Sequence, residues 1–335
     1  MRFARPLTIS TLVLLFASGA MRGAAPPEKP GIVLVVHGGA GDWSKEAPEQ
    51  LEKRQAAITH ALEAGYGVLS KGGRSLDAVE ASLAVMEDSG LFDAGRGGYY
   101  TREGVPELDA SIMDGKTLAA GAVASVKRVA NPIRLARLVL EKTKHVLLVG
   151  EGAEQFAASQ GMSLVSPYYF FTDREWKRWQ KREEEERKKA SPAAEERHGT
   201  VGAVALDQAG DLAAGTSTGG TVWKMPGRVG DSPLIGAGTY ASNESCAVSG
   251  TGVGEFFIRN VVAADIGARV KYLHVPLAKA ADDVVMKELV AQKGEGGVIA
   301  LDRQGNVATP FNTNGMMRGV VRADGKITIQ VWNDR

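Results

Sequence analysis

Hydroxyl side chains next to glycines recur in the second half of the chain, in patterns that could cleave an acyl bond. Residues 215–219, GTSTG, match the GxSxG pattern, in which the central serine, here Ser217, attacks a carbonyl carbon. That chemistry needs an acidic residue and then a histidine downstream. His274 is the only later histidine, and its flanking residues are typical of the edge of a folded segment. A serine esterase therefore remains only an alternative, which predicts that Ser217→Ala abolishes activity in an uncut chain.

A second glycine-rich segment, residues 250–255, GTGVGE, follows an apolar stretch and begins a helical pattern. Glycines let backbone N–H groups approach an anion at a helix N-terminus. The segment lacks the lysine of a P-loop and the spacing of a dinucleotide site, so an oxyanion hole fits it equally well. No catalytic metal or cofactor is expected, because the histidines show no ligand spacing: His37, His60, His145, His198 and His274.

The block from residue 199 to residue 238 carries a more specific pattern. Its segments GTVGAVALD, TSTGG and GRVGDSPLIGAG, at 199–207, 216–220 and 227–238, resemble the plant-type asparaginase and isoaspartyl peptidase family of N-terminal-nucleophile hydrolases. The resemblance covers nearly the whole chain outside its first residues and a charged segment. Further matching segments are HGGAG at 37–41, FDAG at 92–95, ELDASIMDG at 107–115, TGVGE at 251–255 and PFNT at 310–313.

The resemblance makes Thr200 the nucleophile. A threonine hydroxyl is a weak nucleophile without an adjacent base. Cleavage before Thr200 would create an α-amine on the same residue, with a pKa of ~8, so one residue would supply both groups. The hydroxyl of Thr200 would first attack the carbonyl of Gly199, where the absence of a side chain tolerates strained backbone. The expected products are an α chain of residues 31–199 and a β chain of residues 200–335, which fold together as one domain.

The resemblance also implies the residues around the nucleophile. Thr218 is expected to hydrogen-bond the Thr200 hydroxyl and help to set its protonation. Thr251 and the backbone N–H of Gly252 are expected to form the oxyanion hole. A hydroxyl and a glycine amide suit that task, because both can be fixed donors to developing negative charge.

Two charged residues are expected to read the head group of the substrate. The resemblance implies that Arg228 binds an α-carboxylate and Asp231 an α-ammonium. Arginine suits the first role, because its planar fork makes a bidentate pair that lysine cannot copy. The carbonyl of Gly254 is expected to contact the ammonium as well.

The segment from Met86 to Arg96 corresponds to a family loop that holds a structural sodium ion. Asp93 lies in this loop, at a position where members often have asparagine. Its negative charge would either raise the pKa of the Thr200 amine or alter substrate choice, and the sequence leaves both open. The expected sodium ligands are the backbone carbonyls of Met86, Glu87, Ser89, Phe92, Ala94 and Arg96.

The implied reaction is hydrolysis of an amide at the side-chain carboxyl of aspartate, through a β-aspartyl ester on Thr200. Isoaspartyl dipeptides and L-asparagine are the expected substrates, and a dimer of αβ units is the expected assembly. A glycosylasparaginase is the main alternative, although its oxyanion segment usually carries His or Asn where Val253 stands. An exported, non-catalytic binding protein is the alternative of another class, and it predicts an uncut chain.

Alternating apolar patterns define the elements that must position these residues. Residues 31–36 predict a buried strand that ends in a glycine turn at 37–41. Two similar hairpins, near 200–214 and 298–308, flank a helical stretch from Glu255 to about Gln292. Strands grouped in this way predict antiparallel sheets covered by helices, an α+β class. The resemblance narrows this to a four-layer αββα sandwich. Helices are predicted over 51–69, 75–86 and 131–142, with Ser75 as the N-cap of the second.

The segment 173–198 differs from its surroundings, because its charged run at 182–189 has no apolar stripe to bury. Ser191 and Pro192 would stop a helix there. We therefore predict a mobile linker over 173–198, with docking of Trp176 and Trp179 on the folded body as the alternative.

The composition and the N-terminal residues indicate where in or outside the cell the protein is located. The chain of 335 residues has a formal net charge of +1, which gives no electrostatic footprint for nucleic acid. Arg2 and Arg5 precede the apolar run 7–16, with Ser18 and Ala20 at the spacing of a cleavage site. This pattern predicts a secretory signal over residues 1–20, cut somewhere within 20–25, and a periplasmic or secreted protein. The run is too short to span a membrane.

Overall fold

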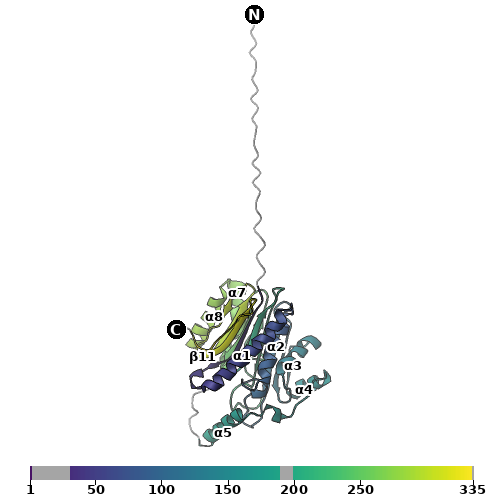
Figure 1. Cartoon of the computed structure of the whole chain (residues 1–335), viewed down its shortest axis with the longest axis vertical. Helices are drawn as coiled ribbons and strands as arrows, with labels where there is room; N and C mark the ends of the chain where they lie inside the picture. The colour runs from purple at the N-terminus through teal and green to yellow at the C-terminus, as the bar shows by residue number, and fades with distance from the viewer. Residues whose placement is uncertain (2–30, 189–198, 334–335) are drawn as a thin grey trace.

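The computed structural model describes residues 31–188 and 199–333 together with Met1, and these residues form helices packed on two β-sheets (Figure 1). Apart from Met1, the predicted signal sequence lies outside the described residues, as does the end of the charged segment. Within the described part of the chain, no helix is both long and apolar enough to cross a membrane. The chain is therefore a mixed α and β protein, as its patterns predict.

The larger sheet has eight strands among the described residues, in the order β12-β11-β1-β5-β6-β2-β3-β4. All neighbours are antiparallel except β3 and β4. The central strands are almost wholly buried, which explains their continuous apolar and small residues. The bounds are β1 Val33–Gly41, β2 Leu108–Asp114, β3 Ala120–Val126, β4 Leu147–Val149, β5 Val201–Leu206, β6 Leu212–Thr218, β11 Gly315–Arg322 and β12 Ile327–Gln330.

The smaller sheet has four strands in the described residues, in the order β10-β9-β8-β7. Both predicted hairpins are confirmed, β5–β6 in the larger sheet and β9–β10 in the smaller one. Cys246 begins β8 and is buried. The bounds are β7 Thr239–Ala241, β8 Cys246–Gly252, β9 Gly296–Asp302 and β10 Val307–Ala308.

The helices divide between the two sheets. The predicted helical stretch between the hairpins is confirmed, with left-handed breaks at Val261 and His274. The bounds are α1 Pro48–Leu69, α2 Ser75–Asp88, α3 Pro132–Lys142, α4 Gly150–Ser159, α5 Asp173–Arg187, α6 Gly254–Asn260, α7 Val262–Leu273, α8 Leu277–Asp282 and a π-helix, η4, over Asp283–Leu289; short 3₁₀ turns are η1 Trp43–Lys45, η2 Gly95–Gly97 and η3 Pro167–Phe170.

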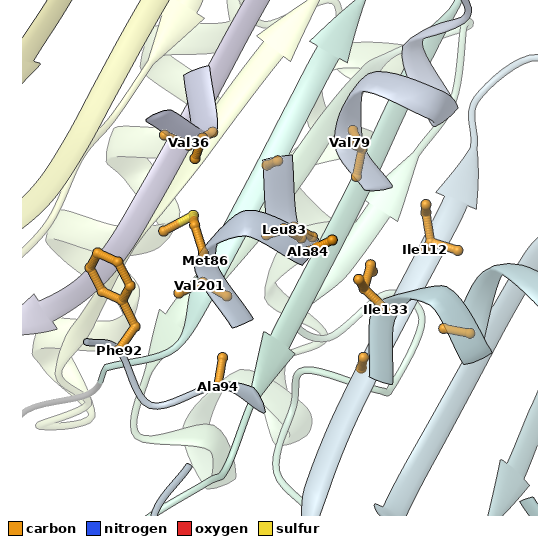
Figure 2. Close-up of a cluster of buried hydrophobic side chains, with 14 of the residues drawn as sticks. Val36, Val79, Leu83, Ala84, Met86, Phe92, Ala94, Ile112, Ile133 and Val201 are labelled. Carbon is orange, nitrogen blue, oxygen red and sulfur yellow. The ribbon is translucent and has the colours of Figure 1, made fainter. Parts of the chain in front are cut away.

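Three hydrophobic cores hold these elements together. The first lies between the larger sheet and α1, α2 and α3, where Leu83 of α2 and Ile133 of α3 point at the strands (Figure 2). The second lies between the sheets and joins Val35 of β1 to Ile299 of β9. The third lies between the smaller sheet and the helices α6 to α8 and η4. Because β5 and β6 contribute to both of the first two cores, their ends are held firmly.

Two local predictions need correction. Residues 37–41 do not end the first strand, because β1 continues to Gly41 through an irregularity between His37 and Ala40. Ser75 is not the N-cap of α2, because it is already helical and its N–H donates to the Asp207 side chain (2.9 Å). An acidic side chain from the β5–β6 turn thus replaces the local cap, and a long-range contact of this kind leaves no mark in the local pattern.

The prediction of a mobile linker is wrong for residues 173–187, which form helix α5. Its docking alternative is confirmed: Trp176 and Trp179 stack with their ring centroids 4.8 Å apart, and Trp179 lies 5.3 Å from Trp223. The indole N–H of Trp179 donates to the Thr101 carbonyl (2.9 Å). Aromatic packing on distant residues therefore stabilises a helix whose own pattern is almost wholly polar. Residues 189–198 lie outside the described part of the chain.

Candidate active site

Thr200 immediately precedes β5 and lies beside the end of β6, because β5 and β6 pair with Val201 opposite Ser217. Its hydroxyl oxygen is 3.0 Å from that of Thr218, as the resemblance implies. Both residues are almost fully buried, at 7% and 2% exposure. A buried hydroxyl pair at this distance keeps the Thr200 oxygen in one orientation.

Asp93 completes a chain of hydrogen bonds from Thr200. The Thr218 hydroxyl donates to one carboxylate oxygen of Asp93 (3.2 Å), and the Tyr99 N–H donates to the other (2.8 Å). A hydroxyl has one proton, so Thr218 in this arrangement accepts the proton of Thr200. Burial raises the pKa of Asp93 to about 7, against the opposing effect of the Tyr99 hydrogen bond. Asp93, at a position where family members often have asparagine, is thus connected to the Thr200 hydroxyl through two hydrogen bonds.

The backbone before Thr200 is also held by Asp93. The Asp93 N–H donates to the Gly199 carbonyl oxygen (3.0 Å), and the Gly219 N–H donates to the Asp93 carbonyl (3.0 Å). A methyl group on Gly199 would lie 2.7 Å from the Asp93 Cβ, so only glycine fits this approach. The carbonyl that precedes Thr200 is therefore polarised by a backbone donor.

Thr251 and Gly252 end strand β8 close to the β1 glycine segment. The Ala40 N–H donates to the Thr251 hydroxyl oxygen (3.3 Å), which fixes that hydroxyl between the two sheets. Behind Gly252, the Val253 N–H donates to the Glu295 carbonyl (2.9 Å). A methyl group on Gly252 would overlap this same carbonyl. The two residues thus provide a hydroxyl and a bare amide on a rigid strand end.

Glycines shape a cradle around Arg228 and Asp231. A methyl group on Gly254 would lie 2.8 Å from an Asp231 carboxylate oxygen and 3.0 Å from an Arg228 nitrogen. One on Gly220, whose N–H donates to the Thr218 hydroxyl, would lie 3.3 Å from Arg228 Nη1. The three predicted residues therefore lie together, and Gly220 connects their cradle to the nucleophile.

The surroundings of Asp231 suit the binding of a cation. It is 5% exposed, and its Oδ2 has no hydrogen-bond partner among the described residues. Burial raises its pKa to about 7, and the nearby Arg228 guanidinium opposes that rise. A buried carboxylate with an unsatisfied oxygen is costly until a donor fills its site.

Sequence patterns missed the partner of Arg228. The Arg228 guanidinium makes a bidentate pair with Glu255, with Nε–Oε1 and Nη2–Oε2 distances of 3.0 Å each. Glu255 is the first acidic residue of α6 and belongs to the TGVGE segment at 251–255. The family motif therefore includes Glu255, but it did not indicate that this residue pairs with Arg228. The carboxylate of Glu255 shows that Arg228 is oriented for bidentate binding of a carboxylate.

A buried histidine was also missed as part of the site. His37 Nε2 lies 3.0 Å from the Ser249 hydroxyl, which is 2.6 Å from that of Thr216. Burial lowers the pKa of His37 to about 3, so the ring stays neutral. A methyl group on Gly202 would overlap both His37 and Ser249. This polar chain crosses from β1 to β8 beneath the nucleophile strand and fixes the two sheets to each other.

Ser217 does not belong to the site. It lies on the opposite face of β6 from Thr216 and Thr218, because successive strand residues alternate between faces. Its hydroxyl donates to Glu87 Oε1 (2.6 Å), which also accepts the Ile133 N–H (3.0 Å) at the start of α3. Burial raises the pKa of Glu87 to about 8. The serine-esterase alternative is therefore contradicted by the position of its nucleophile.

We predict that Ser217→Ala leaves turnover within about twofold of the wild type. The variant should lose about 1–2 kcal/mol of unfolding free energy, because the buried Glu87 carboxyl loses a donor. Steady-state kinetics and a urea unfolding curve measure the two quantities. Loss of turnover in a protein of normal stability would restore Ser217 as a candidate nucleophile.

The predicted sodium loop offers backbone carbonyls in a tight space. Methyl groups on Gly95 and Gly97 would meet the carbonyls of Glu87 and Phe92 respectively, so only glycine lets the backbone approach these carbonyls so closely. The Met86 carbonyl accepts the Ser89 hydroxyl (2.7 Å). Oxygen donors of this kind suit a hard cation. Among the described residues, no cluster of three or more His, Cys, Asp or Glu side chains is placed to hold a metal.

Comparison with known proteins decides the family. A family model described as asparaginase matches residues 30–331. The chain belongs to this family. It is 49% identical to the isoaspartyl peptidase of Salmonella typhimurium, over 85% of this chain and 94% of that protein. Identity is 47% to the isoaspartyl peptidase of Escherichia coli, over 90% and 97%, and 42% to the isoaspartyl peptidase/L-asparaginase of Bos taurus, over 88% and 94%.

Membership covers both halves of the site. The matched residues include the Asp93 loop and Gly199 in the first half, and Thr200, Arg228 and Thr251 in the second. The family match therefore spans every segment that contributes to the site.

Proposed function

We propose that the chain is an amide hydrolase that cuts itself before Thr200 and then hydrolyses β-aspartyl dipeptides and L-asparagine. One observation carries the proposal: the Thr200 hydroxyl, held 3.0 Å from that of Thr218, adjoins a glycine-lined cradle of Arg228 and Asp231. The names of the relatives, isoaspartyl peptidase and isoaspartyl peptidase/L-asparaginase, support the same substrates.

Self-cleavage begins with attack of the Thr200 hydroxyl oxygen on the Gly199 carbonyl carbon. The Asp93 N–H, 3.0 Å from the Gly199 carbonyl oxygen, stabilises the negative charge that develops there. A C–O bond forms, the C–N bond breaks, and the hydroxyl proton ends on the Thr200 nitrogen. Water then hydrolyses the ester, which leaves Gly199 as a carboxylate and Thr200 as a free N-terminus.

Turnover uses the same hydroxyl with its new neighbour. The α-amine of Thr200 takes the hydroxyl proton, and the oxygen attacks the side-chain carbonyl carbon of the aspartyl substrate. Thr251 and the Gly252 N–H stabilise the oxyanion, and the protonated amine gives its proton to the leaving nitrogen. Water then attacks the β-aspartyl ester with the same amine as base. Aspartate leaves, and Thr200 is restored.

Arg228 and Asp231 provide the specificity for an aspartyl head group. The bidentate fork of Arg228 exchanges Glu255 for the α-carboxylate of the substrate. The Asp231 carboxylate accepts the α-ammonium: its Oδ2 has no hydrogen-bond partner among the described residues, and its Oδ1 faces Gly254, whose carbonyl is assigned as the second contact. Because both charges are read, a substrate without a free α-amine or α-carboxylate is rejected.

The proposal extends to organisation and location. The αββα sandwich of the N-terminal-nucleophile hydrolases is supported by the three cores between helices and sheets. We place residues 31–199 in the α chain and 200–335 in the β chain of one domain, with two such αβ units in the assembly. The signal sequence directs the protein to the periplasm or beyond. A sodium ion on the carbonyls of the Met86–Arg96 loop would hold that loop, and with it Asp93, in place.

Intact mass and N-terminal sequencing of the purified protein test the proposal. The expected result is two chains, one of which begins at Thr200. Hydrolysis of a β-aspartyl dipeptide, L-asparagine and a glycosylated asparagine then ranks the substrates. A single uncut chain without turnover would support the non-catalytic binding protein, and preference for the glycosylated substrate would support the glycosylasparaginase alternative.

We predict that L-aspartate inhibits the mature enzyme more weakly as pH falls below about 7. Burial raises the pKa of Asp231 to about 7, so the side chain is ionised above that pH and neutral below it. Only the ionised form attracts the α-ammonium, so the inhibition constant should rise about tenfold per pH unit below the pKa. A flat inhibition constant from pH 5 to pH 8 would contradict this role for Asp231.

A further inference from the structure

The motif PFNT at residues 310–313 has no role in the reaction above, yet its asparagine makes a dense set of contacts. Asn312 Oδ1 accepts the Gly296 N–H (2.8 Å). Its Nδ2 donates to the carbonyls of Gly294 (2.9 Å) and Val285 (3.1 Å). One N–H facing the oxygen and two carbonyls facing the nitrogen fix the orientation of the amide. The Asn312 N–H also donates to the Gly296 carbonyl (3.0 Å).

The segment that Asn312 holds lies directly against the end of β8. Strands β8 and β9 pair with Gly252 opposite Gly296. A methyl group on Gly296 would lie 2.5 Å from the Thr251 carbonyl oxygen and 2.8 Å from Gly252 Cα. No side chain separates the two backbones, so a displacement of Gly296 moves Gly252 with it.

Asn312 also ties this strand to the helices behind it. Val285, whose carbonyl accepts the amide, lies in the π-helix η4. π-Helical turns are rare in proteins, but those that occur frequently lie at functional sites. Gly296 itself has a φ of 153°, a conformation that L side chains rarely adopt. A single amide thus anchors the glycine end of this strand to the helix layer.

We propose that Asn312 is a positioning residue for the oxyanion hole: it holds Gly294 and Gly296 so that the Gly252 N–H stays aimed at the reacting carbonyl oxygen. The inference rests on the proposed function, which makes Gly252 an oxyanion donor. Donors work only within hydrogen-bond distance of the developing charge, and a displacement of about 1 Å costs about 100-fold in rate. Among the described residues, the hydrogen bonds of Asn312 go to Gly294, Gly296 and Val285 and not to Arg228 or Asp231, so binding of the head group stays intact.

Asn312→Ala in the full-length, matured enzyme tests the role. We expect kcat for a β-aspartyl dipeptide to fall about 100-fold, with KM within about threefold of the wild type. Asn306→Ala is the matched control, because Asn306 also bonds through its amide, to Asp302 (2.9 Å), but in the β9–β10 turn. The control should keep kcat within about twofold. If Asn312→Ala does not fold, Asn312→Asp keeps the shape and turns an oxygen toward the two carbonyls, with the same expected fall in kcat.

A double-mutant cycle separates this role from general stability. Thr251→Ala removes the other oxyanion donor, so the loss in Thr251→Ala/Asn312→Ala should be smaller than the product of the single losses. Additive losses, an unchanged kcat in a folded Asn312 variant, or an effect on KM alone would overturn the inference. Turnover in Thr200→Ala would instead overturn the proposed function, so the two failures are distinguishable.

Discussion

Thr200→Ala is expected to yield one uncut chain with no measurable turnover. The substitution removes the oxygen that attacks Gly199, so no amine is freed and no ester can form. Loss of a nucleophile of this kind costs about 10⁶-fold in kcat. A denaturing gel and intact mass report the cleavage, and release of the amine from a β-aspartyl dipeptide reports turnover.

Thr328→Ala is a matched control for this experiment, because Thr328 is an exposed threonine on β12. It should mature fully and keep wild-type kinetics. Two chains or residual turnover in Thr200→Ala would show that another group cuts the chain or attacks the substrate. Either outcome would remove the central claim of the proposed mechanism.

Asp231→Asn is expected to lower kcat/KM for β-aspartyl dipeptides by about 100-fold or more. The amide keeps the size of the side chain but removes the charge that faces the α-ammonium. Losing one partner of a buried charge pair costs about 2–5 kcal/mol, and about 1.4 kcal/mol corresponds to tenfold. Progress curves at substrate concentrations far below KM measure the ratio directly.

Maturation gives the control for Asp231→Asn. Asp231 has no hydrogen bond to Gly199 or Thr200 among those described, so the variant should still yield two chains. A substrate that lacks the α-amine should be hydrolysed equally slowly by the variant and the wild type. A kcat/KM near that of the wild type would show that the ammonium is bound elsewhere.

The sequence predicted those parts of the fold whose cause is local. The buried strand at the N-terminus, both hairpins and the helix after Asn131 follow from apolar spacing and turn residues, and the structure contains each of them. Helix α5 could not be recognised in this way, because Trp176 and Trp179 are stabilised by Tyr100 and Trp223, far away in the chain. A polar pattern says nothing about a partner that only folding supplies.

The same distinction between local and long-range causes applies to the residues of the site. Family motifs located Thr200, Thr218 and Arg228, and the structure brings each to the expected neighbourhood. The pairing of Arg228 with Glu255 spans 27 positions along the chain, and the hydrogen bond of Asn312 to Val285 spans the same number. Contacts between residues so far apart are set by how strands and helices pack, which short motifs do not encode.

The strand order of the larger sheet has a consequence for the matured protein. A cut before Thr200 assigns β12, β11, β5 and β6 to the second polypeptide, and β1, β2, β3 and β4 to the first. Strand β1 then lies between β11 and β5, so the two polypeptides interlock strand by strand. Separating them requires breaking the sheet at three ladders, and each polypeptide alone lacks neighbours for its strands. After cleavage, folding is therefore not reversible. The intact precursor can form this strand order, whereas two unfolded polypeptides would have to insert their strands between one another to form the same sheet.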